Sequence, residues 1–181
     1  MFLTALMLLC VQQILAAAAR YYNSATIAME IQQNMLVSLT RVSAEMSEGS
    51  YFSTQVDEGP PAGVMFWTVR KADGTVELAP NGKAYWQRMV CYYTDTVNGV
   101  PCLVTKYRDG IGQFTEAPVV DSPWDKVATW QAAANLKTKV VARHIREFKV
   151  TNTQPIFLEM TGADPSGRYL IKIDSNVSPR N

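Results

Sequence analysis

The side chains best suited to catalysis are few in this sequence of 181 residues. There is a single histidine, His144, in the run Val-Val-Ala-Arg-His-Ile-Arg-Glu-Phe, which alternates as a strand does. A Ser-His-Asp or Cys-His arrangement needs that imidazole beside an activated nucleophile, and the sequence shows no such context. We therefore interpret His144 as a solvated or half-buried structural residue, and we predict no catalytic residues and no enzymatic activity.

The acidic side chains do not have the spacing of a metal site. Four aspartates could bind calcium in principle: Asp121, Asp125, Asp164 and Asp174. They lack the dense alternation of a calcium loop, so we expect them in turns and helix caps. The run Asp-Gly-Ile-Gly at 109–112 is too short for a phosphate-binding loop and opens no helix. The sequence therefore predicts no metal, no cofactor and no small-molecule substrate.

Charge is nearly balanced overall but unevenly placed along the chain. The formal net charge is +1, which argues against a nucleic-acid partner. The first charged residue is Arg20, and the uncharged run before it is about long enough to cross the hydrocarbon core of a bilayer as a helix. We predict a transmembrane segment there, with a buried soluble helix as the alternative. Gln12 and Gln13 lie inside this run, where amides are expected to make intramembrane contacts with neighbouring helices.

The segment after Arg20 continues as an amphipathic helix. Neither glycine nor proline, the strongest helix breakers, occurs before Gly49. Apolar residues recur at spacings of three and four, the period of one helix face: Ala28, Ile31, Met35, Leu39, Val42 and Met46. One helix of roughly 70 Å is therefore predicted over 1–50, longer than a membrane requires. The alternative is two helices with a break at residues 21–24.

Beyond Gly49 the pattern changes to short β runs, which predicts a second unit over 51–181. Strands are expected at residues 64–70, 84–93 and 103–108, with Asn98-Gly99 as a tight turn. A last hairpin is expected from residues 156–161 and 169–173. Ser122 as N-cap and Pro123 in the first turn predict a short helix near 123–137. The predicted fold class is α+β, with a long N-terminal helix packed on an antiparallel sheet.

Several stretches carry a resemblance to a known family. They are the opening Met-Phe-Leu-Thr-Ala-Leu-Met-Leu-Leu, the pair Tyr21-Tyr22, residues 61–67, 82–88 and 91–93, and the ending Asn-Val-Ser-Pro-Arg-Asn. Together with the long half-apolar helix they resemble the type IV pilin-like family, and in particular minor pilins and J-type pseudopilins of type II secretion. The opening residues are similar to those that follow the family's signature glutamate. We hypothesise that the true start lies a few codons upstream and supplies that signature.

This resemblance implies a non-enzymatic subunit that helps to assemble a type IV pilus or a type II secretion pseudopilus. Its partners would be other pilin or pseudopilin subunits and the bacterial inner membrane. Its C-terminal domain would lie in the periplasm or on the filament. The runner-up is a signal-anchored periplasmic binding or scaffold protein that does not polymerise. A membrane-tethered enzyme is the third alternative, and the absence of a catalytic constellation argues against it.

Three cysteines remain to be placed. Cys10 lies in the apolar run and is interpreted as a small buried residue. Cys91 and Cys102 lie in the domain expected to be exported, and an oxidising compartment favours a disulfide between them. The geometry of the turn is the competing consideration. If Asn98-Gly99 forms a two-residue turn, Cys91 faces Lys106 and the two sulfurs are too far apart to bond, whereas a wider loop would bring them together.

Overall fold

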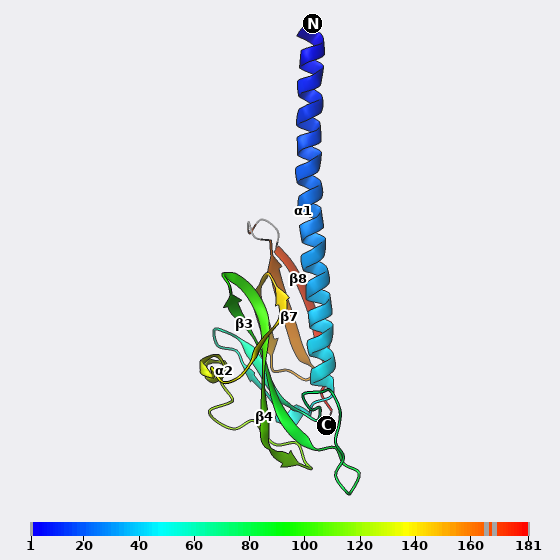
Figure 1. The fold of residues 1–181 in the computed structure, drawn as a ribbon. Helices are drawn as coiled ribbons and strands as arrows, with labels where there is room; N and C mark the ends of the chain where they lie inside the picture. The colour runs from blue at the N-terminus through cyan, green and yellow to red at the C-terminus, as the bar shows by residue number, and fades with distance from the viewer. Residues whose placement is uncertain (1, 165–166, 168–169, 181) are drawn as a thin grey trace.

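The computed structural model describes residues 2–164, 167 and 170–180, with side chains in the first helix described from Leu6 onward. The elements are α1 (Phe2–Ser47), η1 (Tyr51–Ser53), β1 (Thr54–Asp57), β2 (Gly63–Thr68), β3 (Trp86–Val97), β4 (Val100–Phe114), α2 (Val127–Ala132), β5 (Thr138–Arg143), β6 (Ile145–Thr151), β7 (Ile156–Ala163) and β8 (Leu170–Val177). The predicted α+β class is confirmed (Figure 1).

The first helix is a single rod of 46 residues, so the alternative break at residues 21–24 does not occur. Without glycine or proline, nothing in its sequence interrupts the backbone ladder. It ends where Gly49 donates its N–H to the carbonyl of Met46 at 3.0 Å. A Cβ on Gly49 would lie 3.1 Å from that carbonyl oxygen and 3.3 Å from the carbonyl oxygen of Trp67, so the turn after the helix favours a residue without a side chain.

Five strands form an antiparallel sheet in the order β1-β2-β3-β4-β5. The β3–β4 hairpin closes with Val97 paired to Val100, leaving Asn98 and Gly99 as a two-residue turn. Both turn residues have positive φ, 53° and 77°, which is the backbone that Asn-Gly adopts most readily. The turn predicted from the sequence is therefore confirmed, and it fixes the register of the longest hairpin.

A second sheet has the order β6-β7-β8. His144 joins the two sheets, between β5 and β6, with a left-handed φ of 64°. Its carbonyl accepts a hydrogen bond of 3.0 Å from the N–H of Ala163. The prediction that His144 lies within one continuous strand is wrong, because the chain turns at this residue to leave one sheet for the other. The predicted last hairpin is confirmed as β7 and β8.

The short helix is confirmed in part, because α2 covers only six residues instead of the expected 123–137. Its N-cap position is Lys126 and not Ser122. Asp57 at the end of β1 accepts a hydrogen bond of 3.0 Å from the N–H of Val127. At the other end, the buried ammonium of Lys106 donates to the carbonyls of Trp130, Gln131 and Ala133 at 2.6, 3.2 and 3.1 Å. Side chains from distant strands therefore cap both ends of this helix.

The five-stranded sheet is buried on both faces. One face and the three-stranded sheet form a core with the helix stripe, which includes Ile31, Met35, Leu39, Val42 and Met46. The other face forms a second core with α2 and the chain around it, and this core includes Trp67, Cys91, Val104 and Trp130. The predicted apolar stripe of α1 is thus confirmed, because the five predicted stripe residues from Ile31 to Met46 are all buried.

The helix lies very close to β7 at one glycine. A Cβ on Gly162 would meet the sulfur of Met35 at 2.5 Å and the Cγ2 of Ile31 at 2.8 Å. Because real Cβ atoms do not approach other atoms so closely, a larger residue here would displace the side chains of Met35 and Ile31 or the helix that carries them. The absence of a side chain at Gly162 therefore allows α1 to pack closely on the second sheet.

Candidate functional site: the protruding end of the long helix

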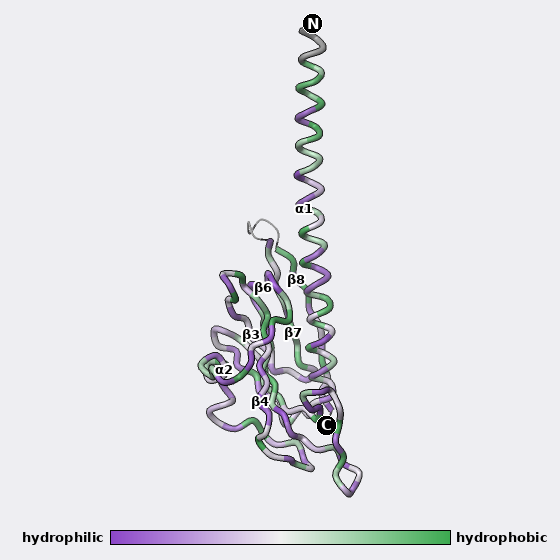
Figure 2. The backbone as a smooth tube through the Cα atoms, in the orientation of Figure 1, coloured by the Kyte–Doolittle hydropathy of each residue, from purple (hydrophilic) through white to green (hydrophobic). Residues whose placement is uncertain are grey.

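The first half of α1 extends beyond the rest of the molecule, and no other helix or strand that the structure describes lies beside it (Figure 1). Every residue from Leu6 to Asn23 is exposed. Besides the aromatic pair Tyr21 and Tyr22, seven of them are large side chains without a polar group: Leu6, Met7, Leu8, Leu9, Val11, Ile14 and Leu15. Figure 2 shows the hydropathy of the rod, in which apolar turns predominate along the protruding part and polar bands interrupt them.

An exposed apolar surface of this extent favours a partner. Full burial of a large aliphatic side chain stabilises by about 1.5–3 kcal/mol, so covering all seven would contribute on the order of 10 kcal/mol. The apolar residues occupy every side of the rod, because a helix turns about 100° per residue and residues 6 to 9 are all apolar. A surface that is apolar all round fits the interior of a helix bundle or a lipid environment better than one flat partner.

In the part of the chain whose side chains the structure describes, no helix is both long and apolar enough to span a membrane. The transmembrane character expected for the first half of α1 is therefore not supported. Gln12 and Gln13 interrupt the apolar run, and the polar residues 20–23 follow it.

The two glutamines are both exposed, and the structure gives neither side chain a hydrogen-bond partner within the described chain. Since they are consecutive, their side chains point about 100° apart around the helix. One neighbouring helix could therefore not easily satisfy both. Their predicted contacts with other helices stay a prediction, and the geometry suggests two neighbours.

The expected disulfide is corrected by the hairpin register. Cys91 pairs across the strands with Lys106, while Cys102 pairs with Asp95. Both thiols are free and buried in the core beneath α2, and burial raises the pKa of Cys91 well above its usual value. The tight Asn-Gly turn is what separates them. Cys10 is free as well but exposed on the protruding rod, and not buried as the sequence suggested.

The candidate calcium ligands do not come together. Asp121 is exposed in an irregular stretch, and Asp174 pairs with Glu159 across β7 and β8. Over residues 2–164, 167 and 170–180, no group of three or more His, Cys, Asp or Glu side chains is arranged to hold a metal ion.

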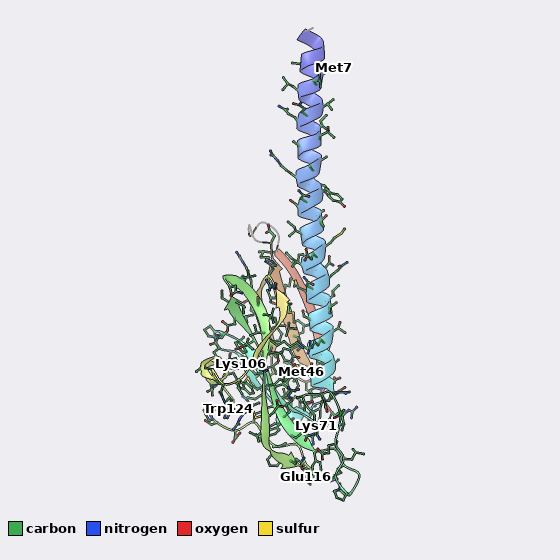
Figure 3. The ribbon with its side chains drawn as sticks, in the orientation of Figure 1. Met7, Met46, Lys71, Lys106, Glu116 and Trp124 are labelled. Atoms are coloured by element: carbon green, nitrogen blue, oxygen red, sulfur yellow. The ribbon has the colours of Figure 1, made fainter. Side chains whose placement is uncertain are left out.

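Sequence reasoning missed a basic groove of about 1060 Å³ beside the C-terminal part of α1. Its charged lining residues come from α1, β3, β4, β5, the residue before β5 and the chain after β2: Arg41, Glu45, Arg70, Lys71, Arg88, Asp109, Lys137 and Lys139. These residues are far apart in the sequence, so no spacing rule could have grouped them. Figure 3 shows Lys71 close to the end of the helix that carries Met46.

We compared the chain with protein-family models, with curated proteins and with solved structures, and none of them matches it.

Proposed function

We propose that the protein is a non-enzymatic subunit of a filament of the type IV pilin-like kind, either a minor pilin or a type II secretion pseudopilin. The observation that carries the proposal is one continuous helix with two different surfaces. Its first half is exposed and apolar, whereas its second half buries a stripe against two sheets. A rod of this kind can hold a folded domain at one end and enter an assembly of like helices at the other.

The proposed mechanism is an exchange of environments. Before assembly the apolar half lies in the inner membrane, with the domain on the periplasmic side. Assembly moves this half among like helices, where Gln12 and Gln13 hydrogen-bond to neighbouring subunits. Arg20, Tyr21 and Tyr22 are all exposed on the helix directly after the apolar run. Aromatic and basic residues at such a position favour the boundary between lipid and water, which supports this orientation.

The alternative is a signal-anchored periplasmic binding or scaffold protein that does not polymerise. It would use the same apolar half, but this half would stay surrounded by lipid. The two functions therefore differ in what contacts the rod in cells. A photo-crosslinking amino acid in place of Ile14, whose side chain is 68% exposed, would report that contact directly.

The filament proposal predicts covalent adducts between position 14 and other proteins that have apolar N-terminal helices, including copies of this chain. The matched control carries the same amino acid in place of Lys83, an exposed residue of the domain. Adducts at position 14 with lipid alone would contradict the filament proposal and favour the signal-anchored alternative. Reaction of Cys10 with an impermeant maleimide in intact membranes would contradict membrane residence of the rod. The label reports Cys10 alone, since Cys91 and Cys102 are buried and should not react.

A further inference from the structure

We propose that the basic groove binds the acidic segment 115–121 of a second copy of this chain, through Glu116 and Asp121. The proposal deepens the filament function and rests on it, because it names a contact between the domains of adjacent subunits. It adds a lateral domain contact to the helix contacts already proposed.

The charge of the groove is the first argument. Six basic residues and two acidic residues line it. Four of the cations have a carboxylate partner in the same chain: Arg41 with Glu45, Arg70 with Glu48, Lys71 with Glu77, and Arg88 with Asp109. Lys137 and Lys139 are exposed and form no ion pair among the described residues. The groove therefore retains two uncompensated positive charges, which match a ligand with two carboxylates.

The floor of the groove is held in place before any ligand arrives. The guanidinium of Arg88 lies over the ring of Tyr107, 3.8 Å from its centroid, and donates to the carbonyl of Lys71 at 3.3 Å. Arg41 contacts the Tyr107 hydroxyl at 3.4 Å and Glu45 at 3.2 Å. Because Arg88 and Arg41 are held by contacts within the chain, the floor of the groove does not need a ligand to order it.

One carboxylate of this network is bound from both sides. The hydroxyl of Tyr92 donates to Glu45 at 2.6 Å, while Arg41 donates to its other oxygen. Burial, followed by the nearby charge of Glu45, raises the pKa of Tyr92 well above its ordinary value, so this hydroxyl stays a donor. Glu45 is thus fully engaged, and the exposed cations without a carboxylate partner, Lys137 and Lys139, are the ones left for an incoming anion.

The same chain carries a surface of the opposite charge. Residues 115–121 follow β4 without regular secondary structure, and the sequence from 113 to 125 contains no lysine or arginine. Glu116 and Asp121 are exposed and have no ion-pair partner among the described residues. Val119 between them is 71% exposed. Two free carboxylates beside an exposed apolar residue suit a groove with two free ammonium groups.

The occupant is a second copy because the two surfaces are complementary and different. A contact between two different surfaces of the same protein is heterologous, and it produces an open helical array unless the rotation closes into a ring. Such an array is the geometry that a filament needs. Figure 3 places Glu116 at the end of the domain farthest from the protruding helix, so the contact would not compete with the helix bundle.

The test uses the full-length chain in detergent, with equal amounts of unlabelled and ¹⁵N-labelled protein. A carbodiimide condenses a carboxylate and a lysine amine in contact into an amide. We expect amides that join Glu116 or Asp121 to Lys137 or Lys139, with half of them linking a light to a heavy peptide. Amides only within light or within heavy chains would place the contact inside one molecule and overturn the proposal, as would their absence.

Charge-reversal variants provide a second, independent test of the contact. Lys137→Glu/Lys139→Glu and Glu116→Lys/Asp121→Lys should each weaken self-association at low salt by about tenfold, and the combined variant should restore it to within about threefold. Lys83→Glu/Lys149→Glu is the matched control, because both lysines are exposed outside the groove and it should bind as the wild type does. No restoration in the combined variant would overturn the proposal.

Two further outcomes separate this proposal from its alternatives. Saturable binding of succinate to the groove, with no effect of the Glu116→Lys/Asp121→Lys reversal on self-association, would assign the groove to a small anion and overturn the proposal. The groove contact should weaken as salt rises, whereas contacts between apolar helices should not. If association resists salt and adducts form at position 14, but the amides do not form, the groove contact is contradicted while the filament function is still supported.

Discussion

The two halves of α1 have the same backbone and opposite surroundings. Residues 6–23 are exposed on every side, whereas Ile31, Met35 and Met46 in the second half are buried against the sheets. Both halves are helical because neither contains a breaker, but only the second is stabilised by packing within the chain. The difference teaches that the continuity of a helix comes from its local sequence, while the role of each part comes from the residues its surface meets.

A charge placed in each half should give the largest difference. Val42 is 0% exposed in the core, so Val42→Asp would bury a carboxylate without a partner and should destabilise the domain by about 4 kcal/mol or more. Ile14→Asp should change the stability of the domain by less than about 0.5 kcal/mol, because its side chain is exposed. All four tryptophans lie in the domain, so their fluorescence in urea measures both variants.

Equal effects of the two substitutions would contradict the division of α1 into two halves. If Val42→Asp prevents folding altogether, Val42→Ala supplies a milder variant on the same site. Under the proposed function, Ile14→Asp should also remove the protein adducts of a photo-crosslinking amino acid placed at the neighbouring exposed Leu15, while the domain stays folded, which separates assembly from stability.

The contact at Gly162 tests how closely the second half is docked. Gly162→Ala would place a Cβ within 2.5 Å of the Met35 sulfur, so it should destabilise the domain by about 1–3 kcal/mol. In the background of Met35→Ala, the same glycine substitution should cost clearly less, because the colliding sulfur is gone. A double-mutant cycle measured by urea denaturation gives the coupling. Strictly additive effects would contradict the close approach of the helix to β7.

Much of this fold was predictable from local patterns. The helix followed from an absence of breakers and from the spacing of residues such as Leu39 and Val42. The β3–β4 hairpin followed from Asn98-Gly99, whose preference for positive φ is a local property. The same turn already implies that Cys91 faces Lys106. The expectation of a disulfide gave more weight to an oxidising compartment than to this register, and the register was the better guide.

The remaining features depend on residues that meet only in three dimensions. The bounds of α2 are set by Asp57 and Lys106, which lie on β1 and β4. His144 turns the chain between two sheets with a backbone that its residue type does not indicate. The basic groove likewise draws on five separate parts of the chain. No periodicity in one sequence identifies contacts of this kind.

The short helix α2 offers a smaller test of the same contrast, because its end is stabilised by a side chain of another element. Lys106→Met removes the ammonium that three carbonyls accept from, and it should destabilise the domain by about 1–2 kcal/mol. Amide hydrogen exchange should rise over residues 127–133 and stay unchanged over the docked half of α1. Unchanged exchange in α2 would show that Lys106 does not hold the end of this helix.

The smallest effect should come from the ion pair at the end of the docked half. Arg70 donates two hydrogen bonds to Glu48, and the one to Oε1 measures 2.7 Å. The hydrogen bond from Arg70 is the main cause that lowers the pKa of Glu48 below its ordinary value. The side chains of Glu48 and Arg70 are 29% and 47% exposed, so solvent screens the pair and its contribution to stability should be the smallest of those compared here.

Because the pKa of Glu48 is lowered in the folded state, this contribution is fully present above the ordinary glutamate pKa of about 4.3 and is lost as the pH falls through the lowered value. Wild type should therefore exceed Glu48→Gln in stability at pH 7, and the two should converge as the pH falls below the ordinary glutamate pKa and through the lowered one. Thermal denaturation of both proteins from pH 7 to pH 3 measures the difference. If the stability difference between the two proteins persists unchanged at low pH, Glu48 acts through packing at the helix end. The ion pair with Arg70 would then not stabilise the end of the docked half.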